Sequence, residues 1–260
     1  MSHGKFVLKI LRGTEGHQYW EEFECDRMIG LNLIGALLEI QKNPVTRQGK
    51  KVEPVAWEMA CLEEVCGSCS MLVNGIPCQA CTVLIEDLIK QSGSTKITLA
   101  PFSKFPVVRD LVINRDSMFT TLKRIEGWVP VENLHSEEFG PKISPTKQEA
   151  MYTESTCMTC GCCLEACPQV NKRSSFMGAA GINQVKYFNA NPIGAALKKN
   201  RLRTLMEKGG ISECGKSMNC VQVCPKEIPL TQSIAQMGKD VSKEYFKVQF
   251  GLPENDTPTY

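Results

Sequence analysis

The chain has 260 residues, of which 42% are hydrophobic and 22% charged, and its formal net charge is +2. This length suits one or two domains, and the composition is that of a folded soluble protein. So small a net charge gives no support for a nucleic-acid partner or an acidic substrate, and we expect neither.

No stretch approaches the roughly 18 uncharged apolar residues of a membrane-spanning helix. The longest candidate, Ile29 to Leu38, is ended by Glu39. The first residues, Met1 to Lys5, lack the apolar region of a signal peptide, so we do not expect general secretory export. Many of the 14 cysteines stand two or three residues apart, which favours shared metal centres in a reducing cytosol over long-range disulfides.

The first part of the chain is predicted to form a sheet with one helix. Alternating apolar residues predict a strand over Lys5 to Leu11, and Trp20 to Cys25 is expected to pair back with it. From Leu31 onward, leucine and isoleucine residues have helical spacing and predict a helix that ends before Pro44. Ser70 to Val73, then Asn74-Gly75, then Ile76 onward predict a hairpin, and Ile97 and Leu99 predict one more strand.

The character changes after about residue 110, where few segments resemble strands. Phe119, Leu122 and Ile125 have helical spacing, as do apolar residues between Ile193 and Met206. The segment Val129 to Pro145 is rich in proline and is predicted to be a surface loop. We expect an α+β protein whose domain boundary lies between residues 105 and 118. A β-grasp plant-type ferredoxin domain would occupy 1–110, and an all-α bacterial ferredoxin-like domain 111–260.

Eleven cysteines form three spaced groups. The first is Cys61-x4-Cys66-x2-Cys69-x11-Cys81, the plant-type spacing for a [2Fe-2S] cluster. Gly67 and Ser68 are small, so backbone amides can approach the sulfurs. Zinc held by Cys66, Cys69, Cys78 and Cys81 is the alternative, but it leaves Cys61 unused.

The other two groups have bacterial-type spacing. Cys157, Cys160, Cys163 and Cys167 are followed by Pro168, while Cys214, Cys220 and Cys224 are followed by Pro225. In two-cluster ferredoxins the fourth cysteine of one run serves the other cluster. This exchange predicts a [4Fe-4S] cluster on Cys157, Cys160, Cys163 and Cys224. Three cysteines then remain for a [3Fe-4S] cluster: Cys167, Cys214 and Cys220.

The three-iron assignment depends on Ser217, which stands where an ordinary run has its middle cysteine. A serine oxygen is a poorer ligand for these clusters than a thiolate. The remaining cysteines, Cys25, Cys78 and Cys162, are interpreted as small buried thiols. Lys198 to Arg203 is basic and is interpreted as a solvated helix face, with lipid headgroups as the alternative partner.

These motifs resemble the iron–sulfur subunit of succinate dehydrogenase and fumarate reductase over nearly the whole chain. The resemblance rests on the joint cysteine pattern and on three segments of the sequence: Cys61-Leu62-Glu63-Glu64-Val65-Cys66-Gly67-Ser68-Cys69, Phe105-Pro106-Val107-Val108-Arg109-Asp110-Leu111, and Asn219-Cys220-x3-Cys224-Pro225-Lys226. It implies an electron-transfer subunit that is active only within an oxidoreductase complex and carries electrons between a flavin and a quinone.

The resemblance also implies partners and a location. A flavoprotein subunit with covalent FAD would carry out the succinate/fumarate chemistry, and a membrane anchor, often with haem b, would bind quinone. The chain would lie peripherally on the cytoplasmic side of the inner membrane, held by that anchor. Pro168, Gly215 and Ser217 would lie near the quinone.

This sequence departs from some ubiquinone-linked members, which have a tryptophan shortly after the Cys-Pro pair and a histidine where Gly215 stands here. The departures favour a different quinone geometry, as in menaquinone-linked relatives. Other functions also fit the cysteine pattern: a subunit of another flavoenzyme, such as a fumarate reductase using thiols, a free ferredoxin-like carrier, or a structural zinc protein. The free carrier is disfavoured by the length, the near-neutral charge and the mixed cluster types. The zinc protein would be colourless, so a visible spectrum of the purified chain distinguishes it.

Overall fold

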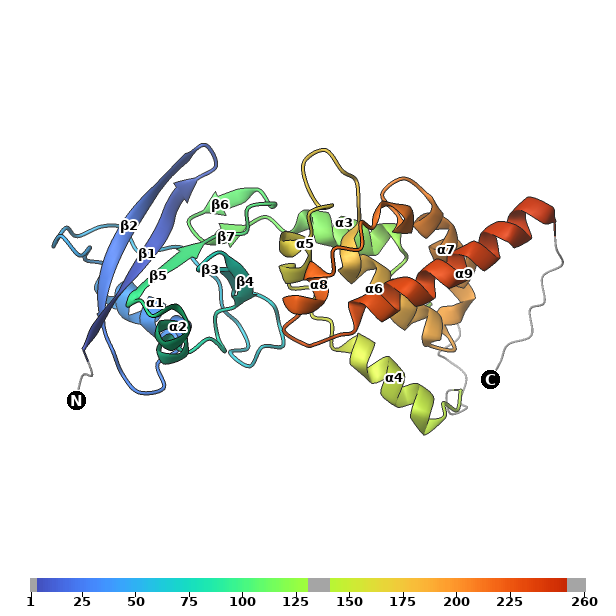
Figure 1. Ribbon diagram of the computed structural model, residues 1–260, viewed down its shortest axis with the longest axis horizontal. Helices are drawn as coiled ribbons and strands as arrows, with labels where there is room; N and C mark the ends of the chain where they lie inside the picture. The colour runs from blue at the N-terminus through green and yellow to red at the C-terminus, as the bar shows by residue number, and fades with distance from the viewer. Residues whose placement is uncertain (1–3, 131–140, 252–260) are drawn as a thin grey trace. The chain divides into compact units, whose positions relative to one another are not determined.

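The computed structural model describes residues 4–130 and 141–251 (Figure 1). Its contacts divide the chain into two compact units. Unit 1 runs to Arg115 and also includes Cys160–Ala166 and Val223–Pro225, and unit 2 contains the remainder. Two cysteine-bearing segments from late in the sequence therefore belong to the first unit.

Unit 1 is built on a five-stranded mixed sheet. The spatial order of the strands is β2-β1-β5-β3-β4, in which β1 and β5 run parallel and the other neighbours run antiparallel. The strands are β1 (Lys5–Thr14), β2 (His17–Asp26), β3 (Ser70–Val73), β4 (Ile76–Gln79) and β5 (Lys96–Ala100). The parallel pair in the centre requires the long crossover that the cysteine loop and helices supply.

Alternation of side chains explains the sheet's core. Phe6, Leu8 and Ile10 of β1 are fully buried, while the residues between them are partly exposed. The predicted strands at Lys5–Leu11 and Trp20–Cys25 are confirmed, and both extend further, with Lys5 opposite Asp26 and Thr14 opposite His17. The predicted hairpin at Asn74-Gly75 is also confirmed, because both residues adopt the positive φ that a tight turn requires.

Two helices pack with this sheet (Figure 1). The helix α1 (Leu33–Lys42) begins where the Asn32 side chain accepts a hydrogen bond from the Gly35 amide at 2.8 Å. The predicted helix in this segment is confirmed. A second helix, α2 (Ile85–Ser92), buries only Ile85 and is not among the predicted elements, although Ile85, Leu88 and Ile89 have helical spacing.

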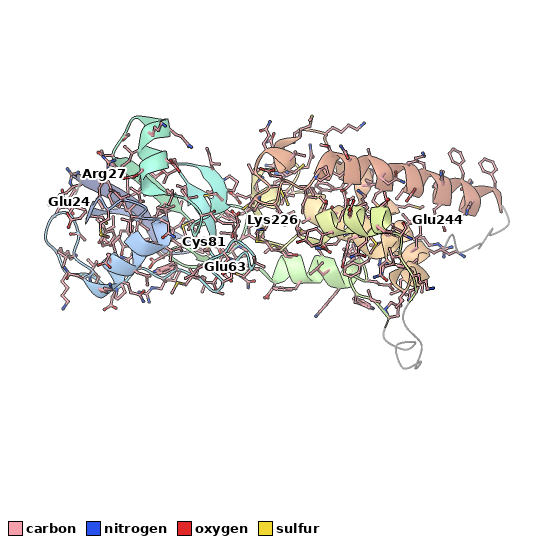
Figure 2. The ribbon with its side chains drawn as sticks, turned by 90° about the horizontal axis from the view of Figure 1, so that it is seen from below. Glu24, Arg27, Glu63, Cys81, Lys226 and Glu244 are labelled. Carbon is pink, nitrogen blue, oxygen red and sulfur yellow. The ribbon has the colours of Figure 1, made fainter. Side chains whose placement is uncertain are left out.

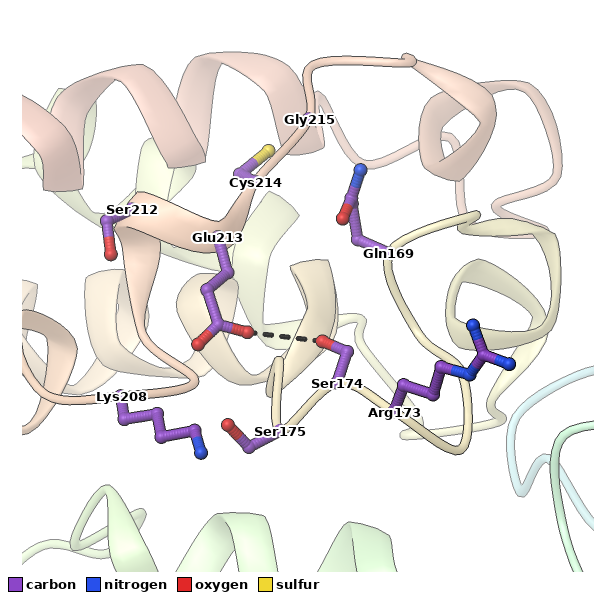
Figure 3. Close-up of a pocket in the computed structure, with 9 residues that line it drawn as sticks. All are labelled: Gln169, Arg173, Ser174, Ser175, Lys208, Ser212, Glu213, Cys214 and Gly215. Atoms are coloured by element: carbon purple, nitrogen blue, oxygen red, sulfur yellow. Dashed lines mark hydrogen bonds between the residues drawn. The ribbon is translucent and has the colours of Figure 1, made fainter.

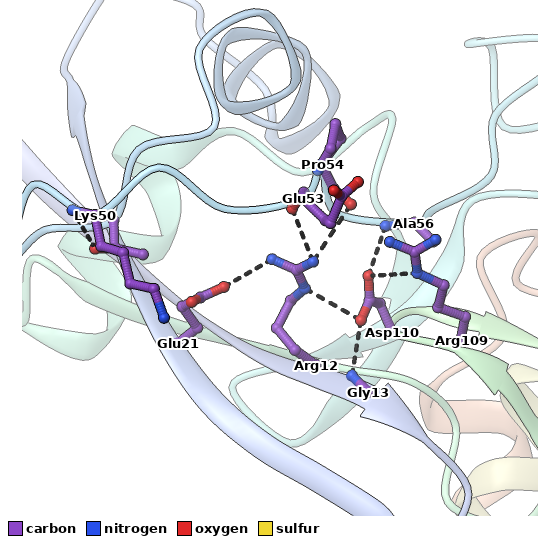
Figure 4. Close-up of polar contacts among 10 residues, drawn as sticks. Arg12, Gly13, Glu21, Lys50, Glu53, Pro54, Ala56, Arg109 and Asp110 are labelled. Carbon is purple, nitrogen blue, oxygen red and sulfur yellow. Dashed lines mark hydrogen bonds and ion pairs between the residues drawn. The ribbon is translucent and has the colours of Figure 1, made fainter.

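A small second sheet in unit 1 positions the buried carboxylate of Asp110. It consists of β6 (Val107–Arg109) and β7 (Val112–Ile113), with Asp110 at the turn in a left-handed conformation. The Asp110 carboxylate accepts hydrogen bonds from the Gly13 and Ala56 amides at 2.7 and 2.8 Å (Figure 4). The end of β1 and the segment leading to the first cysteine loop are thereby held together.

Unit 2 is helical. In Figure 1, α6 and α9 lie side by side, and α7 packs against both. Its elements are α3 (Asp116–Arg124), α4 (Pro145–Ser155), α6 (Gly178–Ala190), η1 (Gly194–Leu197), α7 (Lys198–Met206), η2 (Ile211–Glu213), α8 (Asn219–Gln222) and α9 (Leu230–Phe250). The short helix α5 (Cys162–Ala166) belongs to unit 1. The expected α+β class, a mixed sheet followed by a helical part, is confirmed.

Two local expectations change in the structure. The periodic segment from Ile193 to Met206 is two elements, a 3-10 turn and then α7. Arg201, in the basic stretch, is completely buried and donates hydrogen bonds to the carbonyl oxygens of Gly194 and Trp128 at 2.6 and 2.8 Å. The stretch is therefore not a wholly solvated face, because its central arginine caps carbonyls of the helical core.

The predicted loop from Val129 to Pro145 lies largely outside the described residues. Its last residue, Pro145, is the first residue of α4, where proline's fixed φ and missing N–H are favourable. Within the parts of the chain that the structure describes, no helix combines the length and the apolar character needed to cross a membrane.

Candidate metal centres

The first cysteine loop turns backbone amides toward sulfur. The amides of Glu63, Val65 and Cys66 all lie within 3.4 Å of the Cys61 sulfur. A fourth amide, that of Ser68, donates to the Cys66 sulfur at 3.4 Å. Such amides stabilise negative charge on cysteine sulfur, which is what a bound cluster places there. The loop therefore fits the predicted [2Fe-2S] group.

Strained backbone angles produce this arrangement. Leu62 and Glu64 have φ of 61° and 55°, and Gly67 has 72°. Residues other than glycine rarely adopt these φ angles, and residues with such a strained backbone occur preferentially at functional sites. Left-handed residues turn the chain sharply between the cysteines, so that backbone amides reach the Cys61 and Cys66 sulfurs.

The surroundings of the loop cysteines differ. A hydrogen bond with Ser68 lowers the pKa of the exposed Cys66 to about 6, and burial raises the pKa of Cys69 to about 12. A buried thiolate is costly unless a cation compensates its charge. Iron would supply that compensation at Cys69, because cysteine binds metal as the thiolate.

The fourth predicted ligand of this group, Cys81, directly follows the hairpin. The Ala80 amide donates to the Cys69 carbonyl oxygen at 3.1 Å, and the Asn32 side chain donates to the Cys81 carbonyl oxygen at 2.9 Å. Figure 2 labels Cys81 together with Glu63 of the loop. The hairpin thus brings a residue that is distant in sequence back beside the loop, as the plant-type pattern requires.

An arginine that the sequence did not single out holds the same loop. Arg115 donates to the carbonyl oxygens of Gly67 and Ser68 at 2.7 and 2.6 Å. It also lies 3.4 Å from the Glu58 carboxylate. No motif marks Arg115, because its role arises only when β7 brings the end of unit 1 next to the loop.

Three of the four predicted [4Fe-4S] ligands belong to unit 1. Cys160 is buried just before α5 and Cys163 within it, and Cys224 lies in the segment Val223–Pro225. Positive φ angles again separate the cysteines, at Thr159 and Gly161. The fourth predicted ligand, Cys157, follows α4 in unit 2, where its carbonyl oxygen accepts from Gln184 at 3.5 Å.

A buried carboxylate anchors α5 to unit 1. Glu165 accepts hydrogen bonds from the Ser103 amide and hydroxyl at 2.9 and 2.6 Å, and from the Lys104 amide at 3.1 Å. A carboxylate with three donors is well compensated even though it is buried. This contact explains why a segment so late in the sequence belongs to the first unit.

The predicted [3Fe-4S] ligands all belong to unit 2 and lie near one another. Burial raises the pKa of Cys220, and the neighbouring sulfurs of Cys167 and Cys214 raise it further. Cys167 and Cys214 pack against the helical core. Like-charge repulsion among three thiolates requires cations to hold them together, and the irons of a cluster supply them.

Ser217 lies on an exposed turn between Cys214 and Cys220. Its neighbours Lys216 and Met218 have φ of 55° and 63°. The turn therefore has the same left-handed character as the turns between the other cysteines, although its middle residue is a serine.

A cavity of about 520 Å³ opens beside this group in unit 2 (Figure 3). Cys214 and Gly215 line it, whereas Pro168 and Ser217, also expected near quinone, do not. A Cβ atom at Gly215 would lie 2.5 Å from the Gln169 side-chain nitrogen. The histidine of some relatives at this position therefore does not fit unless Gln169 moves. The other residues lining the cavity are Gln169, Arg173, Ser174, Ser175, Lys208, Ser212 and Glu213.

The structure also bears on single metal ions. Within residues 4–130 and 141–251, no three histidine, cysteine, aspartate or glutamate side chains converge closely enough to hold one ion. The ligands of a cluster surround several iron and sulfur atoms and need not converge on one point.

Two family models match the chain. Residues 7–120 match a 2Fe-2S iron-sulfur cluster binding domain, and residues 154–228 match a 4Fe-4S dicluster domain. Cys61, Cys66, Cys69 and Cys81 fall within the first match, and the remaining predicted ligands fall within the second. The chain therefore carries both kinds of iron–sulfur domain.

Comparison with whole proteins agrees with the two domain matches. The chain is 47% identical to the succinate dehydrogenase iron-sulfur subunit of Bacillus subtilis, over 95% of this chain and 96% of the relative. It is 31% identical to the fumarate reductase iron-sulfur subunit of Wolinella succinogenes, over 70% of this chain and 75% of that one.

A solved structure supports the fold. A chain of the Mycobacterium smegmatis Sdh1 complex in the apo form superposes with a TM-score of 0.78 at 20% identity, covering 93% of this chain and 97% of that one. With the cysteine groups, both domain matches and a near-full-length relative in agreement, the chain belongs to the family of iron–sulfur subunits of succinate dehydrogenase and fumarate reductase.

Proposed function

We propose that this chain carries electrons, one at a time, between the FAD of a flavoprotein subunit and a quinone in the membrane. The route would run through a [2Fe-2S], a [4Fe-4S] and a [3Fe-4S] cluster with the ligand sets assigned above. The observation that carries the proposal is the near-full-length similarity to a succinate dehydrogenase iron-sulfur subunit together with all three cysteine groups.

The chain's own residues would hold the clusters and set their surroundings. The clusters would supply the one-electron chemistry. The amides around Cys61 and Cys66 stabilise charge on sulfur, and Arg115 fixes the loop that carries them. Burial of Cys69, Cys160 and Cys220 excludes water from much of the site, which also affects the reduction potential.

The partners follow from this function. A flavoprotein subunit with covalent FAD would dock near the exposed cysteine loop, where Leu62 and Val65 are about half exposed. A membrane anchor, with or without haem b, would hold the chain peripherally on the cytoplasmic side of the inner membrane. No helix of the described residues could replace that anchor.

The test is to purify the tagged chain from membranes of its own organism. We expect it to copurify with a covalently flavinylated subunit and a hydrophobic anchor, and to contain about nine iron atoms per chain. Succinate should reduce the iron–sulfur centres, and electron paramagnetic resonance (EPR) should resolve three of them. A preparation that lacks a flavoprotein, or that stays near two or four irons after anaerobic reconstitution, would overturn the proposal.

A further inference from the structure

The C-terminal end of α9 extends out of the helical core of unit 2. The earlier turns of this helix pack on α6 and α7. Its last buried residue is Glu244, and every residue of 245–250 is exposed. In Figure 1 this end of the helix reaches past α7. We call residues 239–250 the α9 tip.

Large apolar side chains are exposed on the α9 tip. Tyr245, Phe246, Val248 and Phe250 are between 52% and 67% exposed. Successive residues of a helix are about 100° apart, so these four side chains spread over about half of its circumference. Phe246 and Phe250, one turn apart, stack with their ring centroids 6.0 Å from each other. So much exposed apolar surface in one short segment is typical of a binding surface.

The same turns carry three lysines at a spacing of four residues. Lys239, Lys243 and Lys247 are all exposed. Their spacing places them on one side of the helix, and Phe246 and Phe250 lie on that same side. Aromatic rings and ammonium groups therefore share the outward side of the tip.

The acidic residues of the α9 tip do not cancel this charge. Glu244 is buried, and its carboxylate lies 3.7 Å from the Arg203 Nε. Asp240 is half-buried and accepts a hydrogen bond from the Gln236 side chain at 3.0 Å. The fully exposed residues of the tip therefore carry only positive charge.

These features fit an anionic lipid surface better than a protein groove. A helix that docks in a protein groove presents one apolar stripe, whereas the α9 tip mixes aromatic and lysine side chains on the same side. At a membrane surface the two kinds of side chain suit each other, because aromatic rings favour the headgroup level and lysine stems extend past them to the phosphates. A second copy of the chain would bring like charges together.

We propose that the α9 tip contacts anionic phospholipid headgroups of the membrane on which the complex lies. This inference rests on the proposed function, in which an anchor subunit holds the chain at the membrane. Because the anchor keeps lipid close by, a contact that is weak for the free chain is still occupied in the complex. The tip orients unit 2 on the membrane and does not replace the anchor, since binding through three lysines is salt-sensitive.

The experiment is cosedimentation of the full chain with vesicles at low salt. Phosphatidylcholine vesicles with about one third phosphatidylglycerol should bind the chain, pure phosphatidylcholine vesicles should not, and high salt should release it. Lys239→Gln/Lys243→Gln/Lys247→Gln should lower the partition coefficient about 100-fold, since each lysine near an anionic surface contributes about fivefold. Phe246→Ser/Phe250→Ser should lower it about tenfold.

Two matched controls carry the same changes elsewhere on the surface. Lys42→Gln/Lys50→Gln/Lys51→Gln removes three exposed lysines of unit 1. Phe119→Ser/Tyr152→Ser removes two exposed aromatic side chains from α3 and α4 of unit 2. Both controls should bind as the parent chain does. Equal losses in the tip variants and the controls, or equal binding to neutral and anionic vesicles, would overturn the proposal.

A second measurement separates lipid from a protein partner. The detergent-solubilised complex with the triple lysine variant should retain its anchor and its flavoprotein, because the substituted side meets lipid. Loss of either subunit, or a dimer of the chain that the phenylalanine variant dissociates, would assign the α9 tip to a protein partner and refute the lipid contact. The vesicle assay needs neither subunit, so a negative result there leaves the proposed electron transfer intact. A chain that binds vesicles but copurifies with no flavoprotein would refute that function alone.

Discussion

Arg12 and Asp110 form an ion pair inside unit 1, with Nε and Oδ1 3.1 Å apart and both side chains nearly inaccessible to water. Arg12 also lies 2.7 Å from the Glu21 carboxylate and donates to the carbonyl oxygen of Glu53 at 2.9 Å (Figure 4). The pair joins the first hairpin, the β6–β7 turn and the segment before the cysteine loop. Both members have further partners in these segments, so the pair helps to fix how the segments meet.

Removing one member of this pair should destabilise the protein strongly. Asp110→Ala removes one of the two carboxylates that face Arg12 and leaves the Gly13 and Ala56 amides without their buried acceptor, and we expect a loss of about 3 kcal/mol in the free energy of unfolding. Urea unfolding of the full chain followed by circular dichroism measures it. The control, Glu22→Ala, breaks more exposed pairs with Arg47 and Lys96 and should cost less than about 1 kcal/mol. Equal effects would contradict the structural role given to Asp110.

Arg115→Leu should weaken retention of the [2Fe-2S] cluster. The variant removes both hydrogen bonds to the loop carbonyls, so the flanking Cys66 and Cys69 lose their fixed positions. Losses at supporting residues around metal sites are about tenfold or more. The measurement is the rate at which the cluster's visible absorbance bleaches in the presence of a chelator. Arg109→Leu, a half-exposed arginine in the same unit, should bleach at the normal rate.

Ser217→Cys should convert the three-iron centre into a four-iron centre. The new thiol stands between Cys214 and Cys220 in an exposed turn and restores the ordinary bacterial run. The EPR signal of the oxidised three-iron cluster should vanish, and the added thiolate should lower the potential and slow quinone reduction, while succinate oxidation with an artificial acceptor persists. Ser212→Cys adds a thiol on the other side of Cys214 and should leave the signal in place. Persistence of the signal in Ser217→Cys would refute Ser217 as the missing ligand position.

Cys25 should resist alkylation at moderately alkaline pH. Burial, together with the smaller effect of the nearby Asp26, Glu24 and Glu39 carboxylates, raises its pKa to about 12. A thiol in the unfolded chain ionises near pH 9.0. Iodoacetamide at pH 9 followed by mass spectrometry should therefore leave Cys25 unmodified in the folded protein and label it after unfolding. Rapid labelling in the folded protein would contradict its burial.

The raised pKa of Cys25 also determines how the stability of the protein depends on pH. Above pH 9 the unfolded state releases the Cys25 proton while the folded state keeps it, so the folded state binds more protons and stability falls as the pH rises toward 12. Cys25→Ala should flatten that part of the stability profile, measured by urea unfolding between pH 8 and pH 11. A profile as steep as that of the parent protein would show that other groups cause it.

The sequence alone was sufficient for the features that depend on local spacing. Three cysteines within Cys61–Cys69 must share one loop whatever the rest of the chain does, and Asn74-Gly75 between apolar residues must turn. The exchange of fourth ligands between the bacterial-type runs, with Cys224 assigned to one group and Cys167 to the other, was an analogy to two-cluster ferredoxins. That assignment stays a prediction, although Cys224 belongs to the unit that contains Cys160 and Cys163.

The tertiary structure decided the contacts between segments that are remote in sequence. Arg115 holds the cysteine loop, Asp110 holds the end of β1, and Gln79 bridges Cys69 and Cys162, yet none of the three stands in a spacing pattern. Arg201 likewise looked like part of a solvated basic stretch and is buried. Spacing is a property of one segment, whereas burial and hydrogen-bond partners arise only when packing brings several segments together, and for that reason these residues could not be identified before the fold was known.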